Sequence, residues 1–214
     1  MAQANILEGR KTNCPLCNGD EVQPVEELTG GQLRALWKEL DCEFSAEAWG
    51  EIDGNFRVAR CRCVRCGFGF FDPRLAGNEA FYRELERPEY FATSRPEFAR
   101  TLGFARRNKV RRVLDVGCGS GIFLDQAKQA GYEPCGVELN LAAAEKARAK
   151  GHTVFGRLLS HLDWEETGGG FDLITFFQVV EHLPEPVTTM RQAAALLKPG
   201  GHIFVVVLFA DGLY

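Results

Sequence analysis

The sequence predicts an α/β fold, in which a parallel sheet with flanking helices follows a small cysteine-rich module. Two C-x-x-C pairs, with 45 residues between Cys17 and Cys63, mark the module. Residues 112–209 alternate apolar runs with helical patterns, the order that is typical of βαβ units. Residues 73–111 are rich in Arg, Glu and aromatic residues and favour helices. We therefore predict three parts: a module at 12–72, a helical linker or cap at 73–111, and an α/β domain at 112–214.

The first two parts carry short elements with recognisable ends. Apolar residues at 33, 36, 37 and 40 predict an amphipathic helix over 29–40, with Thr29 as its N-cap. A second short helical turn is predicted at 44–49. Strands at 56–59 and 68–71 flank the second cysteine pair. The helices expected in the second part span 78–86 and 96–107.

The third part gives the predicted sheet. Strands are expected at 112–116, 134–137, 153–155, 171–177 and 202–209, and helices at 122–130, 141–149 and 187–197. Gly131, Gly151 and Gly200 each follow a predicted helix, where a C′ glycine belongs. Residues 199–201 then turn the chain into the last strand.

A glycine-rich loop joins the first of these strands to the first helix. The segment at 115–121 reads D-V-G-C-G-S-G. Glycines let a ligand lie against bare backbone, and the helix that follows offers free N–H groups, so we expect a nucleotide cofactor here. A dinucleotide fingerprint would require glycine at 122, where the chain has Ile122. Glu138, which ends the second strand, disfavours a 2′-phosphate, so NADP is not expected.

Three motifs in order carry a family resemblance. The D-x-G-x-G-x-G loop, the acid Glu138, and the segment F-D-L-I-T-F-F-Q-V-V-E-H-L-P-E-P at 171–186 together resemble class I S-adenosylmethionine-dependent methyltransferases. The resemblance covers about residues 110–208. It implies a Rossmann-like methyltransferase sheet, of which this chain contains five of the usual seven strands. The family's cofactor is S-adenosyl-L-methionine.

The resemblance also implies roles for single residues. Asp115 would orient the loop and the methionine amino group, although it could simply cap N–H groups of the loop. Glu138 would hold the ribose, and Gln178 would lie beside the sulfonium. The remaining cofactor contacts implied lie in the loop and after the second strand: Gly117, Cys118, Gly119, Gly121 and Leu139. Cys118 is interpreted as a small loop residue, not as a nucleophile.

Two further polar residues are catalytic candidates. Glu181 and His182 could act as general acid and base, because histidine titrates near neutrality. Alternatively, this pair ties the loop to the helix that follows. Methyl transfer needs a base only when the acceptor must lose a proton early. His152 shows no partner pattern and is interpreted as structural or solvent-facing.

The cysteine pairs predict a structural Zn²⁺ site. Two knuckles supply four thiolates, the tetrahedral set that zinc prefers, from Cys14, Cys17, Cys63 and Cys66. Four buried thiols are the alternative, and Cys61 could replace Cys63. The arrangement resembles bacterial methyltransferases with an N-terminal zinc-binding module. Some of those modify nucleotide-linked sugars and others modify ribosomal RNA.

Charge and these motifs leave three functions open. A net charge of −4 argues against a general nucleic-acid coat protein, but residues 57–112 hold 14 Lys and Arg against 6 Asp and Glu, a local balance of +8. The first hypothesis is a methyltransferase that acts on a small metabolite such as a nucleotide sugar. The second is an RNA methyltransferase that uses the zinc module and the basic middle. The third is a non-enzymatic interaction protein.

The ends of the sequence give two further expectations. The apolar run at 203–209 would form an edge strand, which predicts an incomplete sheet and self-association through that strand. No apolar run approaches the roughly 18 residues of a membrane span, and residues 1–11 lack the pattern of a signal peptide, so a cytoplasmic location without membrane contact is expected.

Overall fold

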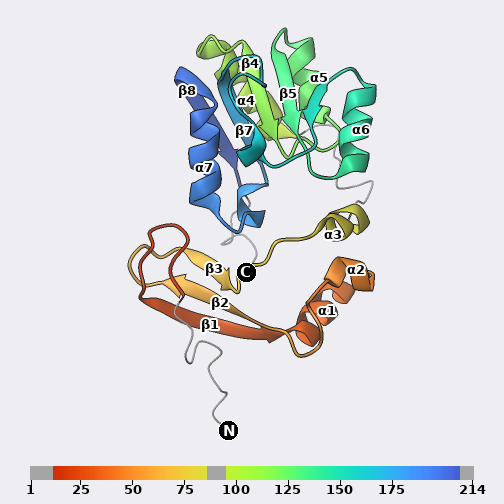
Figure 1. The fold of residues 1–214 in the computed structure, drawn as a ribbon, viewed down its shortest axis with the longest axis vertical. Helices are drawn as coiled ribbons and strands as arrows, with labels where there is room; N and C mark the ends of the chain where they lie inside the picture. Colours follow the sequence, from red (N-terminus) through yellow and green to blue (C-terminus); the bar gives the residue numbers. More distant parts are fainter. Residues whose placement is uncertain (1–11, 86–94, 208–214) are drawn as a thin grey trace. The chain divides into compact units, whose positions relative to one another are not determined.

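The computed structural model describes residues 12–85 and 95–207, which fall into two compact units (Figure 1). The N-terminal unit contains residues 12–85 together with the short segment Pro184–Val187. The C-terminal unit contains the other described residues. The boundaries expected at residues 72 and 111 remain predictions.

The N-terminal unit is built on a three-stranded antiparallel sheet. Its strands are β1 (Val22–Thr29), β2 (Arg57–Cys63) and β3 (Gly69–Asp72), in that spatial order. Three short helices accompany the sheet: α1 (Gly30–Glu39), α2 (Ala46–Trp49) and α3 (Glu79–Glu84). Thr29 caps α1 as predicted, because its side chain accepts a hydrogen bond from the Gln32 amide while the Gln32 side chain accepts one from Thr29.

Strand β1 has no counterpart among the predicted strands. Its sequence V-Q-P-V-E-E-L-T is largely exposed and contains a proline, so it lacks the apolar alternation that signals a strand. The structure uses it as an edge strand with a register shift between Pro24 and Glu26, which is where a proline is tolerated. Tertiary pairing with β2 therefore decides its conformation.

The C-terminal unit contains the predicted parallel sheet of five strands, so the predicted fold class is confirmed. The spatial order is β6-β5-β4-β7-β8, and all four neighbouring pairs are parallel. The strands are β4 (Arg112–Val116), β5 (Glu133–Val137), β6 (Thr153–Phe155), β7 (Phe171–Phe177) and β8 (Leu197–Val206). The helices are α4 (Pro96–Arg107), α5 (Ile122–Gln129), α6 (Leu141–Ala149) and α7 (Pro186–Ala195).

Alternation along the strands separates two apolar layers. Val113 and Leu173 point to the face that packs against Phe98 of α4 and Phe123 of α5. Their neighbours Leu114 and Ile174 point to the opposite face, which packs against Ala193 of α7 among others. All seven of these side chains are nearly inaccessible to water, which is why β4 and β7 are rich in apolar residues on both faces.

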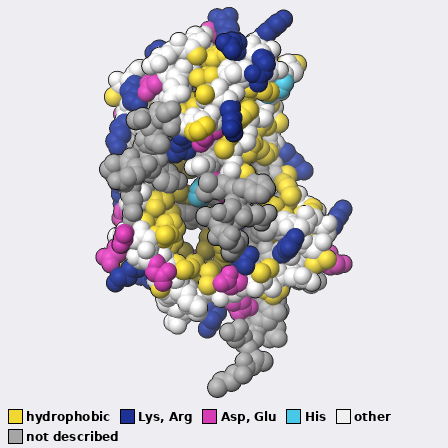
Figure 2. Space-filling view, turned by 180° about the vertical axis from the view of Figure 1, so that it is seen from behind, with side chains coloured by type: hydrophobic (Ala, Val, Ile, Leu, Met, Phe, Trp, Pro, Cys, Tyr) yellow, Lys and Arg dark blue, Asp and Glu magenta, His cyan; other side chains and the backbone are white. Residues whose placement is uncertain are grey.

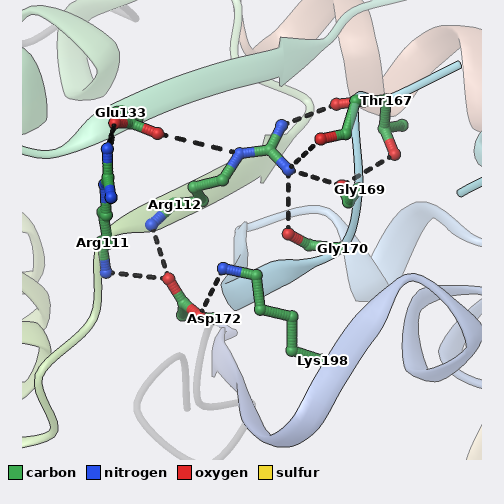
Figure 3. Close-up of polar contacts among 9 residues, drawn as sticks. Arg111, Arg112, Glu133, Thr167, Gly169, Gly170, Asp172 and Lys198 are labelled. Carbon is green, nitrogen blue, oxygen red and sulfur yellow. Dashed lines mark hydrogen bonds and ion pairs between the residues drawn. The ribbon is translucent and has the colours of Figure 1, made fainter. Parts of the chain in front are cut away.

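A polar network fastens the amino ends of the strands (Figure 3). The Asp172 carboxylate accepts hydrogen bonds from the amides of Arg111 and Arg112 and from Lys198 Nζ, at 2.7–2.9 Å. The Arg112 guanidinium donates to four consecutive carbonyl oxygens of the loop before β7, at residues 167–170. The network joins β4, β7 and β8 at the edge of the sheet opposite to the glycine loop.

The last helix and strand differ from the prediction. Helix α7 ends at Ala195 and β8 already begins at Leu197, so a helix to 197 and a strand from 202 are both wrong. Phe171 pairs with Leu197 and Leu173 pairs with His202, so the residues between them bulge out of the strand pairing. Gly200 has a φ of 80° within this bulge and does not cap a helix. The predicted strand residues 208 and 209 lie outside the described residues.

Smaller differences concern helix ends. Asn78 caps α3 and is not part of it, since its side chain accepts a hydrogen bond from the Phe81 amide. Gly131 and Gly151 follow α5 and α6 with φ of 87° and 81°, as C′ glycines do. Across the two described ranges, no helix combines the length and apolar character needed to cross a membrane.

Candidate functional site

The carboxyl ends of three neighbouring strands bring the predicted cofactor residues to one edge of the sheet. Val116 of β4 pairs in register with Val137 of β5 and with Phe176 of β7. The residues that follow these strand ends therefore lie side by side, and they include Gly117, Glu138 and Gln178. In an open parallel sheet this edge is where ligands bind.

The glycine loop adopts a backbone that side chains would obstruct. Gly117, Gly119 and Gly121 have φ of 73°, 53° and 81°. A Cβ on Gly117 would also lie 2.6 Å from Cγ2 of Val179, closer than non-bonded carbon atoms approach. The amides of Gly117 and Cys118 donate to the Val137 carbonyl, which ties the loop to the end of β5. The pattern of glycines thus meets a geometric requirement of this turn.

Glu138 supports the loop from the neighbouring strand end. Its Oε2 accepts a hydrogen bond from the Gly119 amide at 2.8 Å, and its Oε1 accepts one from the Asn140 amide at 2.7 Å. Each carboxylate oxygen can accept a further hydrogen bond, so both retain capacity for hydroxyl donors. Leu139, the next residue, is half exposed and presents an apolar side chain beside the carboxylate.

Asp115 is buried near the end of β4. Thr175 Oγ1 of the adjacent strand donates to Asp115 Oδ1 at 2.7 Å. Burial raises the pKa of Asp115 to about 7, the Glu138 charge adds to the rise, and Thr175 and Arg95 oppose it. Thr175 was not among the predicted site residues. Its signal in the sequence is a single hydroxyl within the apolar strand F-D-L-I-T-F-F.

Gln178 follows β7 in a left-handed conformation, with φ of 57°. Its amide donates to the Val206 carbonyl of β8 at 2.8 Å. Its Oε1 accepts a hydrogen bond from Arg95 Nη1 at 3.1 Å. Arg95 immediately precedes α4, and nothing in the local sequence sets it apart from the other arginines nearby. It was missed because only the packing of α4 brings the start of this helix to the strand ends.

Two predicted catalytic residues lie on the surface next to this edge. Glu181 and His182 are both exposed in a short 3-10 turn, Val180–His182. The His182 amide donates to the Val179 carbonyl, which closes the turn. Their assignment as general acid and base remains a prediction. Cys118 is buried, and burial raises the pKa of its thiol, so this residue is protonated at neutral pH.

The four predicted metal ligands converge in the N-terminal unit. The Sγ atoms of Cys14, Cys17, Cys63 and Cys66 all lie within 4.8 Å of one another. The Cys14–Cys66 and Cys17–Cys63 sulfur pairs are each 3.6 Å apart. Four sulfurs at about 2.3 Å from one zinc ion form a tetrahedron with edges of about 3.8 Å. The donor set and its spacing therefore fit a zinc ion.

Cys61, the alternative ligand, lies outside this cluster. It is fully buried, its Sγ–H donates to the Ala59 carbonyl, and burial raises the pKa of its thiol to about 11.

Comparison with known proteins identifies a family for the C-terminal unit. The model of the methyltransferase domain family matches residues 83–213. The ubiquinone biosynthesis O-methyltransferase of Vibrio parahaemolyticus is 34% identical over 100 residues, which are 44% of this chain and 42% of that protein. The corresponding enzyme of Bordetella avium is 37% identical over 100 residues, 44% and 41% of the two chains. This chain thus matches less than half the length of these relatives.

A solved structure extends the likeness to three dimensions. It is the S-adenosylmethionine-bound amino pentose methyltransferase of calicheamicin biosynthesis from Micromonospora echinaspora. The two chains are 26% identical with a TM-score of 0.50, and the match covers 64% of this chain and 58% of that protein.

Proposed function

This chain belongs to the methyltransferase domain family, and on that premise we propose that it transfers a methyl group from S-adenosyl-L-methionine to a small metabolite such as a nucleotide sugar. The observation that carries the proposal is the strand edge at which the glycine loop, Asp115, Glu138 and Gln178 meet. The likeness to a sugar-modifying methyltransferase supports the substrate class. A ubiquinone precursor, suggested by the relatives in Vibrio and Bordetella, is the competing small acceptor.

The residues of this edge have distinct proposed roles. Glu138 accepts hydrogen bonds from the ribose hydroxyls, and Leu139 gives an apolar contact beside it. Asp115 accepts hydrogen bonds from the amino group of the methionine moiety. The backbone of Gly117, Cys118, Gly119 and Gly121 forms the floor on which the cofactor lies.

Gln178 and Arg95 add a polar end to the site. The guanidinium of Arg95 is a fixed positive charge that suits a carboxylate, and Gln178 orients it through the 3.1 Å hydrogen bond. When bound, S-adenosyl-L-methionine supplies an electrophilic methyl group, so the protein mainly aligns donor and acceptor. Where an acceptor must lose its proton, His182 and Glu181 are the groups we propose to receive it.

We also propose that the N-terminal unit holds one structural zinc ion through Cys14, Cys17, Cys63 and Cys66. All four donor positions are taken by the protein, and such closed sites support the fold without taking part in catalysis.

The cofactor assignment is tested by replacing Glu138 with alanine. We expect wild-type protein to bind S-adenosylhomocysteine and not NAD, and Glu138→Ala to weaken that binding by about 1–3 kcal/mol, the scale of hydrogen bonds to a charged group. Isothermal titration calorimetry measures both. Glu133→Gln, at the other end of β5, is the matched control and should bind as the wild type does. Equal affinities for wild type and Glu138→Ala would rule out the ribose role.

Mass spectrometry then identifies the acceptor. The protein is incubated with S-adenosyl-L-methionine and a panel of nucleotide sugars and polyprenyl phenols, and products are sought that are heavier by one methylene group. A methylated phenol without any methylated sugar would replace the proposed substrate class.

One feature favours the RNA methyltransferase hypothesis as a second candidate. Arg100, Arg106, Arg107 and Lys109 are all exposed along α4 and the turn after it. In Figure 2, dark blue Lys and Arg side chains gather at the upper end of the view. A basic surface binds RNA by displacing counterions, so affinity for RNA should fall steeply with salt. Filter binding of RNA at several salt concentrations decides this point, and replacement of Arg106 and Arg107 by glutamine should flatten the slope.

A further inference from the structure

Three side chains join two helices beside the glycine loop. Asp125 lies in the first turn of α5, whereas Lys150 and His152 directly follow α6. Asp125 Oδ1 lies 2.7 Å from His152 Nε2, and Asp125 Oδ2 lies 2.8 Å from Lys150 Nζ. We refer to Asp125, Lys150 and His152 as the clasp.

The clasp reaches the backbone of the loop itself. Lys150 Nζ also donates to the Ser120 carbonyl oxygen at 2.9 Å. Ser120 stands between Gly119 and Gly121, and glycines adopt many conformations at little cost. Because the peptide group is planar, the direction of the Ser120 carbonyl sets the direction of the Gly121 amide. A charged donor outside the loop thereby selects one loop conformation.

Packing under the loop makes the clasp rigid. The His152 side chain is only 2% exposed. A Cβ on Gly121 would lie 3.0 Å from Cβ of Ala147 and 3.3 Å from Cδ2 of His152, so the loop rests directly on these residues. Burial raises the pKa of Asp125, but the hydrogen bonds from Lys150 and His152 outweigh it and leave the pKa lowered. The carboxylate is therefore ionised at neutral pH and holds both partners.

We propose that the clasp holds the cofactor loop in its binding conformation. Within the clasp, Lys150 is the residue that contacts the loop backbone, through its hydrogen bond to the Ser120 carbonyl. Lys150 and His152 act through Ser120 and Gly121 and not by touching the reacting atoms. The proposal rests on the proposed function, because it assumes that this loop binds S-adenosyl-L-methionine. It assigns a role to a histidine whose sequence context showed no partner.

Lys150→Met tests the proposal in the full chain. Loss of the restraint lowers the fraction of molecules with a competent loop, and we expect S-adenosylhomocysteine to bind about three- to tenfold more weakly. Lys150→Arg keeps a charged donor and should restore affinity to within about twofold of the wild type. Lys128→Met, which removes an exposed lysine from the last turn of α5, should bind as the wild type does.

Affinity and stability separate a positioning role from a merely structural one. Calorimetry is done at a temperature at which circular dichroism shows every variant to be folded. A structural role would lower Tm and leave Kd unchanged, whereas the clasp predicts a change in Kd of the folded protein. If Lys150→Met fails to fold, Asp125→Asn replaces it with the same expectation. If wild type and the folded variant bind S-adenosylhomocysteine equally well, the positioning role of the clasp is wrong. If wild type itself does not bind S-adenosylhomocysteine, the proposed function is wrong.

Discussion

Replacement of Cys63 with serine is expected to remove zinc from the protein and to unfold the three-stranded sheet of the N-terminal unit. The buried core of this unit near the cysteines is small, and three of its five buried residues are themselves cysteines. A structural zinc ion contributes binding free energy on the order of 10 kcal/mol, comparable to the whole stability of a small domain. Cys63 belongs to the buried end of β2, so its loss affects both the metal and the strand.

Elemental analysis and limited proteolysis measure this effect. Wild type purified without chelator should contain about one zinc per chain, and Cys63→Ser should contain much less and be cleaved rapidly within residues 12–72. Cys42→Ser is the control, because Cys42 lies outside the cluster that could hold a metal. Metal-free wild-type protein, or a Cys63→Ser variant with full zinc content and unchanged cleavage, would contradict the zinc assignment.

The second large effect concerns Asp115 and pH. The pKa of Asp115 is about 7 in the folded state, compared with 3.8 for an unperturbed aspartate in the unfolded chain. Because the folded state binds the proton more tightly, protonation of Asp115 favours folding. This contribution is fully present below pH 4 and is lost as the pH rises to about 7. The shift corresponds to about 4 kcal/mol of unfolding free energy. Asp115→Asn should remove this dependence, because an amide keeps an acceptor for Thr175 and does not ionise.

The difference between wild type and Asp115→Asn isolates this contribution. Asp125 and Asp172 have lowered pKa values and act in the opposite sense at acid pH, but they are present in both proteins and cancel. Chemical denaturation from pH 4 to pH 8 should show the variant gaining stability relative to wild type as the pH rises. A constant difference across this range would show that Asp115 is ionised throughout.

The same group should make cofactor binding depend on pH. An amino group in the cofactor is attracted to the ionised form of Asp115, so the affinity of wild type for S-adenosylhomocysteine should rise as the pH approaches 7. Asp115→Asn should bind more weakly with a flatter pH profile. Calorimetry at several pH values checks both statements.

Much of the C-terminal unit follows from the sequence alone. The strands at Arg112–Val116, Thr153–Phe155 and Phe171–Phe177 were predicted with the ends that the structure has, as were the helices Pro96–Arg107 and Leu141–Ala149. Local signals suffice here because buried parallel strands are continuous apolar runs and because prolines, caps and C′ glycines mark helix ends. The glycine loop and each of the two C-x-x-C pairs could also be recognised from the sequence, because the residues of each motif lie close together in the chain.

Tertiary structure alone decided the features that depend on contacts between distant segments. Strand β1 has an exposed, charged sequence and forms only because β2 offers it a partner. The sequence of residues 199–201 predicts a turn before the last strand. In the structure, β8 pairs with β7 on both sides of these residues, which therefore form a bulge within β8. Three hydrogen bonds at the site join residues that are far apart in the sequence. Arg95 donates to Gln178, Thr175 donates to Asp115, and Lys150 donates to the Ser120 carbonyl, across sequence separations of 83, 60 and 30 residues. Hydrogen bonds of this kind form only after helices and strands have packed, so no local sequence pattern predicts them.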